Sequence, residues 1–455
     1  MARFQSAKSE RLLGTNKYMD QNTMDGSGEA LKCRYQCASE RNSEEALNVI
    51  EVNFRNDRRW MDFIISHPDA LIYHHPGWLS ALESEYGRKC TALACEAPDG
   101  AFRAILPLLP TRGLPFRIGR HVISRRLSSL PRTPLAGPVA DNAHAMKAIL
   151  ERAIMLVQAE PNVQLEIKST LPGLDQLVPG LTCAHWRGTY TRALPNTETN
   201  KAQNLNQKTR QPRPCSNCDD CRQLRFGSAR ANHQVRWAAK KALKEGVSLC
   251  ADKQAKELRN WYRLYLEVMR RNVVPPRPFR FFQALYSELS PLGHLALVLA
   301  ELDHHPDGSA PSSVDSQKRD THDAVNRSGL ISGSILLQFG QTAIWAFTGS
   351  NDLCLRLHAN DLTLWNCMHD SCMHGFNWFD LGEVAENHPE LIQFKAKWGA
   401  VLQPTYRYYY PISSSPSAPD VQPAAAMMTR IAAFAWQRLP LSMVELFGDW
   451  AYRFL

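Results

Sequence analysis

Two side chains near the carboxyl end of the chain are of the kinds that amide formation uses. Asp380 lies in a short apolar run that begins at Trp378, and Lys395 follows in the dipeptide Phe394-Lys395. Amide formation requires an amine held against an activated carbonyl, with donors for the charge that develops on the carbonyl oxygen. A carboxylate at a strand end could orient the amine or accept its proton. Two other interpretations stay open: Asp380 as the cap of a helix that begins after Gly382, and Lys395 as a surface lysine.

An aromatic cluster much earlier in the chain is a candidate acceptor site. Tyr73, His75 and Trp78 are close in sequence. Their ring faces and imidazole would suit a sugar or peptide acceptor. The alternative interpretation is that these residues anchor a core or a turn.

Composition favours a large cytoplasmic protein. The chain has 455 residues, of which 44% are hydrophobic, enough for two medium-sized cores. Twelve scattered cysteines fit a reducing compartment. Cys215, Cys218 and Cys221 have CxxCxxC spacing that could hold zinc or an iron-sulfur cluster, but no second CxxC pair follows, so we expect a reduced loop without metal. The amino terminus lacks an apolar signal segment, and no apolar run is long enough to predict a spanning helix.

The net charge of +9 is unevenly distributed along the chain. Basic residues gather between residues 112 and 132 and again between 222 and 244. In the second stretch, Arg236, Lys240 and Lys244 are four residues apart, which places them on one helix face. Such clusters suit a polyanion, namely a phosphate-bearing donor, RNA or an anionic membrane surface. The alternative is a solvated basic face.

Hydrophobic periodicity predicts an α/β protein in which one unit of hairpin, helix and strand occurs twice. Helices are expected at 60–65, 76–86, 143–159, 229–245, 256–270, 279–289 and 355–374. Strands are expected at 91–96, 102–109, 163–167, 188–194, 294–302, 330–339, 342–348, 378–381 and 406–410. The two units are expected to form two domains.

The composition along the chain predicts the boundaries of these domains. Residues 1–45 are expected to be disordered and 46–194 to form the first domain. Residues 195–228 are a polar insertion that carries the CxxCxxC sequence, and 229–411 form the second domain, itself interrupted by a polar insertion at about 304–328. A linker at 412–426 leads to amphipathic helices at 427–455.

The order of these motifs resembles the FemAB-related acyltransferases, a GNAT-like family that includes the peptidoglycan interpeptide-bridge enzymes. FNWFDLGEVAENHPELIQFKAKWGAVLQPTYRYYYP contains a D-x-G strand end, an FK pair and a W-G turn. YHHPGWLSALESEYG and RLSSLPRTPLAGP are similar to the first half of the family, and LYLEVMRRNVVPPRPFRFF and AIWAFTGSN to the second. WQRLPLSMVELFGDWAYRFL resembles a tail of the exopolysaccharide-linked branch. The resemblance implies two tandem GNAT-like domains, with mixed sheets flanked by helices, polar insertions and a helical tail.

The resemblance also implies roles for particular residues. Lys395 would contact the donor and stabilise the transition state, with Phe394 beside it. The donor would be a co-substrate rather than a tightly bound cofactor, either acyl-CoA or aminoacyl-tRNA. The Gly-rich phosphate turn of acetyl-CoA-dependent GNAT proteins is absent after the strand at 342–348, although Arg356 and helix amides there could hold a phosphate. Arg236 and Lys240 would fit an aminoacyl-tRNA, but the coiled-coil arm of some bridge enzymes is absent.

These observations predict an N-acyltransferase that transfers an acyl or aminoacyl group to an amine of a cell-envelope or exopolysaccharide precursor. The alternative is a non-catalytic GNAT-like binding or scaffold protein in polysaccharide assembly, which the missing phosphate turn favours. The predicted location is cytoplasmic. Apolar residues of the tail, together with Arg430, Arg438 and Arg453, would allow a peripheral contact with the inner face of the membrane, unless the tail packs on the second domain.

Overall fold

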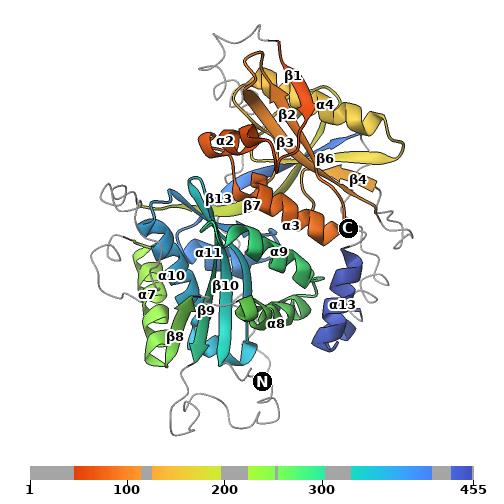
Figure 1. Ribbon diagram of the computed structural model, residues 1–455. Helices are drawn as coiled ribbons and strands as arrows, with labels where there is room; N and C mark the ends of the chain where they lie inside the picture. Colours follow the sequence, from red (N-terminus) through yellow and green to blue (C-terminus); the bar gives the residue numbers. More distant parts are fainter. Residues whose placement is uncertain are drawn as a thin grey trace, which may run out of the picture.

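One mixed β-sheet runs through both halves of the protein (Figure 1). The computed structural model describes residues 46–113, 125–195, 224–251, 255–302, 329–411 and 432–452. The strand order is β1-β2-β3-β4-β6-β13-β7-β12-β11-β10-β9-β8, and β5 pairs with β3. The predicted α/β fold class with a helical tail is therefore confirmed. The amino terminus predicted to be disordered, the CxxCxxC cysteines and the linker at 412–426 lie outside the described residues.

The first half places helices on both sides of an antiparallel hairpin. Its strands are β1 (Asn48–Glu51), β2 (Thr91–Glu96), β3 (Phe102–Thr111), β4 (Arg125–Ser128), β5 (Val139–Ala140), β6 (Val163–Ser169) and β7 (Thr182–Ala193). Its helices are α2 (Arg58–Ser66), the 3-10 turn η2 (Ile72–His74), α3 (Pro76–Tyr86), α4 (Ala143–Gln158) and α5 (Leu174–Leu177). α3 has the predicted bounds because Pro76 occupies its first position and Gly87 ends it in the left-handed conformation.

The second half repeats this alternation. Its helices are α7 (Ala229–Lys244), α8 (Ala255–Arg271), α9 (Phe279–Leu289), the 3-10 turn η5 (Asp352–Leu357), α10 (Ala359–Met373), α11 (Pro389–Lys397) and α13 (Leu441–Ala451). Its strands are β8 (Val247–Ala251), β9 (Leu295–Leu302), β10 (Leu330–Phe339), β11 (Thr342–Ser350), β12 (Trp378–Glu383) and β13 (Val401–Tyr410). The single helix predicted at 355–374 is wrong, because His358 adopts a positive φ of 56° and separates η5 from α10.

Two strands cross between the halves. β7, from the first half, pairs antiparallel with β12 of the second half. β13, from the second half, pairs with β6 of the first half and with β7. β7 and β13 therefore have two strand partners each and extend beyond the predicted 188–194 and 406–410. The exchange makes one sheet of both halves, while the predicted domain boundaries at 194 and 411 stay a prediction.

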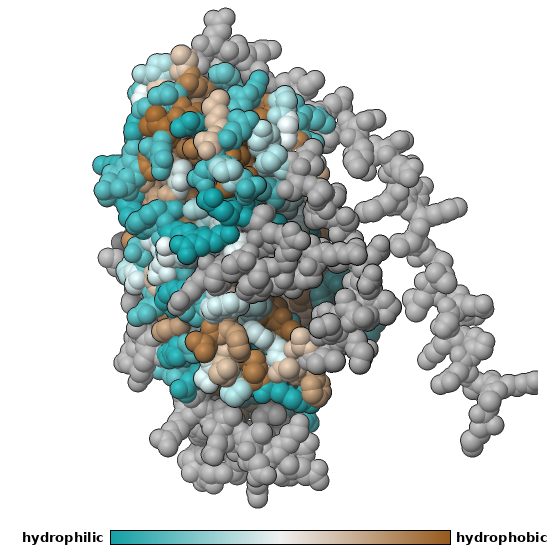
Figure 2. Space-filling view, turned by 90° about the vertical axis from the view of Figure 1, so that its right-hand side faces the viewer, coloured by the Kyte–Doolittle hydropathy of each residue, from teal (hydrophilic) through white to brown (hydrophobic). Residues whose placement is uncertain are grey.

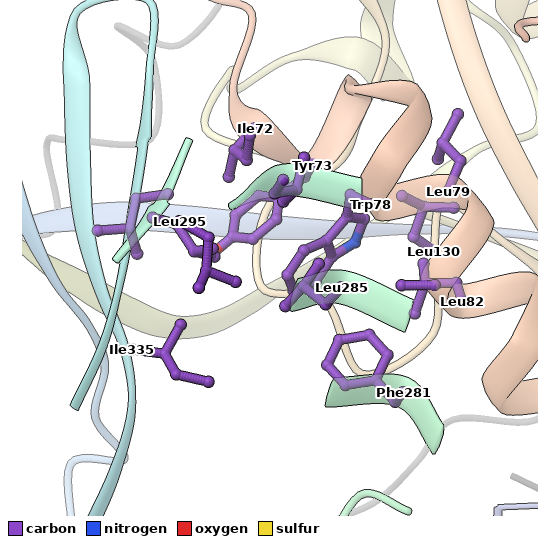
Figure 3. Packing of buried hydrophobic residues seen from close by; sticks show 14 of the residues in the cluster. Ile72, Tyr73, Trp78, Leu79, Leu82, Leu130, Phe281, Leu285, Leu295 and Ile335 are labelled. Carbon is purple, nitrogen blue, oxygen red and sulfur yellow. The ribbon is translucent and has the colours of Figure 1, made fainter. Parts of the chain in front are cut away.

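A hydrophobic core fills the contact between the halves (Figure 3). Tyr73 and Trp78 of the first half pack toward Phe281 and Leu285 of α9, and the Trp78 and Phe281 rings meet edge to face at 5.5 Å. Beside this core, Nη1 of Arg277 pairs with Oε2 of Glu85 at 2.5 Å, and both side chains are buried. The pair joins α3 of the first half to the segment that precedes α9 in the second half.

The insertion predicted at 195–228 is not exposed along its whole length. Leu224 and Phe226 are fully buried, and the Phe226 ring contacts Trp365 and Trp398 at 5.0 and 5.2 Å. The polar sequence up to residue 223 obscured this point, because only two apolar residues, Leu224 and Phe226, re-enter the core. The chain therefore returns to the core at Leu224, inside the predicted insertion.

The carboxyl-terminal helix α13 packs against α8 (Figure 1). Val444, Gly448 and Tyr452 face the core, and Val444 and Tyr452 are fully buried. Nη1 of Arg259 pairs with Glu445 at 2.8 Å, and Arg280 pairs with Asp449. Packing of the tail on the second half, one of the two interpretations from sequence, is thus confirmed for these residues. No helix in the described ranges is both long and apolar enough to cross a membrane.

Candidate functional site

Strands β11 and β12 separate at Asp380. The two strands pair in parallel through Thr342, Ala343 and Ile344 of β11, and the ladder ends where Ile344 faces Asp380. β11 nevertheless continues to Ser350. In open α/β sheets, ligands bind beyond strand ends at points where the connectivity leaves neighbouring strands apart. The separation of β11 and β12 is therefore a candidate site.

The D-x-G sequence at 380–382 forms an irregularity in the pairing of β12 with β7. Oδ1 of Asp380 accepts hydrogen bonds from Thr189 Oγ1 at 2.8 Å and from the Gly382 amide at 2.7 Å. Gly382 has a φ of 83°, which a residue with a Cβ adopts only with strain. Burial raises the pKa of Asp380, and the two hydrogen bonds and Lys395 partly oppose that rise. The interpretation of Asp380 as a helix cap is wrong, because the next helix begins at Pro389.

Lys395 reaches the same turn from α11. Its Nζ donates hydrogen bonds to the carbonyl oxygens of Gly382 at 2.8 Å and Glu383 at 3.2 Å, and the residue is 4% exposed. It is therefore not a surface lysine. Burial lowers its pKa to about 8, against the opposing effect of Asp380 and Glu383. At pH 7 the side chain is mostly an ammonium with three N–H donors, of which these two carbonyls engage two.

The W-G turn at 398–399 ends the helix that carries Lys395. Gly399 has a φ of 79°, and its amide donates to the Ala396 carbonyl at 2.9 Å. Arg192 of β7 donates from Nη1 to the Trp398 carbonyl at 2.6 Å and from Nη2 to the Arg225 carbonyl. A strand from the first half therefore fixes the carboxyl end of α11. Sequence analysis did not single out Arg192, because its partners are carbonyls that are distant along the chain.

A pocket opens between β11, α10 and α11. Its lining includes Trp345 and Thr348 of β11, the first residues of α10, and Leu391 and Phe394 of α11. The Phe394 ring stacks on Trp345 with 6.5 Å between ring centres. Phe394, predicted to bind substrate, is thus a wall of this pocket, one residue before Lys395.

The charged side chains at the amino-terminal end of α10 neutralise one another. Asp361 lines the pocket in the first turn of the helix. Its Oδ1 lies 2.9 Å from Lys397 Nζ, and its Oδ2 lies 3.3 Å from His358 Nδ1. The positive end of this helix dipole is therefore already occupied by a carboxylate.

The basic residues predicted to bind the donor are dispersed. Arg356 is exposed on η5. Arg236 donates to the Leu224 carbonyl at 3.1 Å and lies over the Trp365 ring, which is a packing role. Lys240 is exposed on α7, which fits both a polyanion-binding face and a solvated basic face, so its role in donor binding stays a prediction. One turn away, the exposed Trp237 contacts His358 at the pocket, so α7 borders the pocket.

The aromatic cluster of the first half is buried. Tyr73, His75 and Trp78 are 3%, 4% and 1% exposed. His75 Nδ1 accepts the Gly77 amide at 3.0 Å, and burial lowers the pKa of His75 to about 4. Burial raises the pKa of Tyr73, and the charges of Asp380 and Glu383 raise it further. A role of the three residues in acceptor binding stays a prediction.

A strip of charged side chains crosses the exchanged strands. Arg407 of β13 pairs with Glu166 at 3.0 Å and lies 3.7 Å from Glu383, whose carbonyl holds Lys395. Lys168 lies opposite Arg407 in the register and donates to the Leu130 carbonyl at 2.5 Å. Burial lowers the pKa of Lys168 to about 7. Sequence analysis missed this strip because β6 and β13 meet only in the folded protein.

A metal centre is not found in the described part of the chain. No group of three or more His, Cys, Asp and Glu side chains there could hold a metal ion. Cys215, Cys218 and Cys221 lie outside the described residues, so the predicted metal-free loop stays a prediction.

Comparison with known proteins gives matches among solved structures alone. No family model and no curated protein matches the sequence. FemX has a similar structure with a TM-score of 0.55 and 16% identity, over 85% of this chain and 100% of FemX. L-PGS from Bacillus licheniformis has a similar structure with a TM-score of 0.43 and 10% identity, over 80% of this chain and 97% of that protein. A tandem GNAT protein from the clavulanic acid biosynthesis pathway has a TM-score of 0.43 and 10% identity, over 81% of this chain and 100% of that protein. The likeness to FemX shows that this chain shares the fold of that protein, in agreement with the α/β fold expected from its motif order.

Proposed function

We propose that the protein is an N-acyltransferase that moves an acyl or aminoacyl group onto an amine of a cell-envelope or exopolysaccharide precursor. The observation that carries this proposal is the position of Lys395. Its ammonium is buried at the separation of β11 and β12, is held by two backbone carbonyls, and lies one residue from a pocket wall. A buried, fixed ammonium is suited to stabilise developing negative charge, because the surroundings need not reorganise during the reaction.

The proposed reaction begins with the donor carbonyl placed at the strand separation. The amine attacks the carbonyl carbon, and the carbonyl oxygen becomes negatively charged. The third N–H of Lys395, beyond those given to Gly382 and Glu383, would donate to that oxygen. The donor's sulfur or ribose oxygen then leaves with the electron pair of the broken bond as the carbonyl re-forms. The proton that the amine loses would pass to Asp380 and then to the leaving group or to solvent.

Asp380 would orient the attacking amine. Both of its hydrogen bonds go to Oδ1, so Oδ2 is the oxygen that would accept a hydrogen bond from the amine. A raised pKa makes the carboxylate a stronger proton acceptor than an exposed aspartate. Thr189 and the Gly382 amide would keep that carboxylate in one orientation.

Both donor classes, acyl-CoA and aminoacyl-tRNA, are retained as co-substrates. The pocket beside Phe394 has room for the acyl chain or aminoacyl group between Trp345 and Leu391. Asp361, at the start of α10, disfavours a pyrophosphate there, although its pairing with Lys397 reduces this effect. Exposed Lys240, next to the aromatic Trp237, would suit a polyanionic donor that extends over α7.

A direct assay tests the proposal. The purified protein is incubated with acyl-CoAs or aminoacyl-tRNAs and with nucleotide-linked and lipid-linked envelope precursors, and products are identified by mass spectrometry. Resistance of the product to hydroxylamine distinguishes an amide from an ester. Asp380→Asn, which keeps an oxygen for Thr189 and Gly382 but loses the charge, should reduce the rate while leaving the fold intact.

A matched control removes a lysine elsewhere. Lys147→Met, on α4 in the first half, should have the wild-type rate because Lys147 makes only an exposed pair with Glu151. Binding of a precursor in calorimetry without turnover on any donor would contradict the proposal and favour the non-catalytic binding protein.

A further inference from the structure

Helix α13 presents apolar side chains to solvent and turns its acidic side chains inward. Met443, Leu446, Phe447 and Trp450 are 38%, 60%, 41% and 45% exposed. On an ordinary surface helix the exposed positions are polar and the apolar stripe faces the core. Here the two acids, Glu445 and Asp449, are partly covered and pair with Arg259 and Arg280.

The orientation of α13 is fixed by its packing. A Cβ at Gly448 would lie 2.6 Å from the Pro276 carbonyl oxygen, so this close approach requires glycine. Val444 and Tyr452, one turn on either side, are fully buried, and the Tyr452 ring lies 5.9 Å from Tyr86. The helix therefore cannot rotate its apolar residues inward without losing this contact.

The exposed side chains form a patch of the size that marks a binding surface. The four residues together expose roughly 400 Å², within the range of functional apolar patches on monomers. Figure 2 views the side of the molecule on which α13 lies and shows hydrophobic surface among hydrophilic residues in its lower half. A stable dimer buries about 800 Å² on each partner, so this patch is too small to form one by itself.

The charges around the patch fit an anionic surface. Glu445 and Asp449 are neutralised by arginines, so no unpaired carboxylate of α13 opposes a negative partner. The neighbouring helix α8 contains five basic and two acidic residues; of the basic ones, Arg259 pairs with Glu445 and Arg271 with Asp352. Arg270 of α8 donates to the Leu439 carbonyl just before α13. Arg438, the residue before Leu439, is exposed. Trp450 and Phe447 are side chains that favour the boundary between lipid headgroups and acyl chains.

We infer that the exposed face of α13, made of Met443, Leu446, Phe447 and Trp450, docks on an anionic phospholipid bilayer at the boundary of headgroups and acyl chains. The contact is peripheral and reversible, because only one helix face enters and Gly448 keeps the helix attached to the protein. This inference does not depend on acyl transfer.

Vesicle sedimentation tests the inference with the full-length protein. The probes are vesicles of phosphatidylcholine alone and of phosphatidylcholine with about a third phosphatidylglycerol. Wild type should bind the anionic vesicles more strongly, and higher salt should weaken binding. Leu446→Glu with Phe447→Glu should lower the bound fraction at least about tenfold, because two apolar side chains are lost and two like charges are added. Met155→Glu, an exposed apolar residue on α4, is the matched control and should bind as wild type does.

Three results would overturn the inference. Wild type that stays in the supernatant with both vesicle types has no bilayer-binding face. A concentration-dependent dimer in light scattering that the double substitution abolishes would assign the face to a second copy. A fall in melting temperature of many degrees in the double variant would mean that the chain itself covers this face, since solvent-exposed substitutions change stability little.

Discussion

Replacing Lys395 by methionine should abolish most activity without destabilising the protein. Methionine has a similar length and good helix propensity, so α11 should form normally. Loss of one donor to a developing oxyanion lowers turnover by about a hundredfold to a thousandfold. The measurement is kcat with the donor and acceptor identified by the transfer assay.

Stability should respond differently because the ammonium is buried. The fall in pKa from 10.5 to about 8 means that the fold disfavours the charged form by roughly 3 kcal/mol. The substitution removes that penalty but loses two hydrogen bonds, each contributing about 1 kcal/mol. The two effects nearly cancel, so the melting temperature at pH 7 should move by a few degrees or less, and upward if it moves.

The pH dependence gives an independent check. Between pH 8 and 10.5 the unfolded protein binds more protons at Lys395 than the folded protein does, so this group makes folding more favourable as pH rises through that window. Any stability advantage of Lys395→Met over wild type should therefore shrink from pH 8 to 10.5. Wild-type activity should also decline above about pH 8 as the ammonium is lost.

Two outcomes would refute this reasoning. Full activity of Lys395→Met on a confirmed substrate would remove the lysine from the reaction. A melting temperature lowered by ten degrees or more would show that Lys395 is a structural residue whose hydrogen bonds outweigh its burial penalty.

Other substitutions probe the surroundings of this site. Gly382→Ala should destabilise the protein by about 1 to 2 kcal/mol in thermal unfolding, because alanine is strained at a φ of 83°, and should reduce turnover by displacing the carbonyl that holds the lysine. Arg192→Ala should lower both the melting temperature and kcat, whereas an unchanged kcat would show that this arginine does not position α11. Truncation at Pro419 should lower the melting temperature by exposing the core around Tyr452, and a stable truncated protein would contradict this packing. Deleting 196–223 should leave a folded protein by circular dichroism.

Local structure followed from the sequence where neighbouring residues supply the signal. The bounds of α3 and α9 are as predicted, since apolar spacing, prolines at the starts and, for α3, a glycine after the end act over a few residues. The residues of the D-x-G, FK and W-G motifs are brought together in the fold. In the folded chain Asp380, Gly382 and Lys395 form one hydrogen-bonded unit, which explains why these residue types occur in that order.

Long-range contacts decided the features that the sequence left open or concealed. The helix predicted at 355–374 is interrupted at His358, where Asp361 pairs both with His358 and with Lys397 of another helix. Thr189 and Arg192 join the site because β7 crosses to the second half, and strand pairing between distant segments leaves little trace in either segment alone.

The sequence by itself determined most of the helices and strands, their order and the presence of a carboxyl-terminal amphipathic helix, but it did not predict β1, β4 or β8. Tertiary structure alone decided which face of that helix is buried. Apolar residues occur on more than one face of α13, so hydrophobic periodicity cannot predict which of these faces is buried. Close approach to Pro276 makes the choice, because only the side with Gly448 lacks a Cβ that would collide with that backbone.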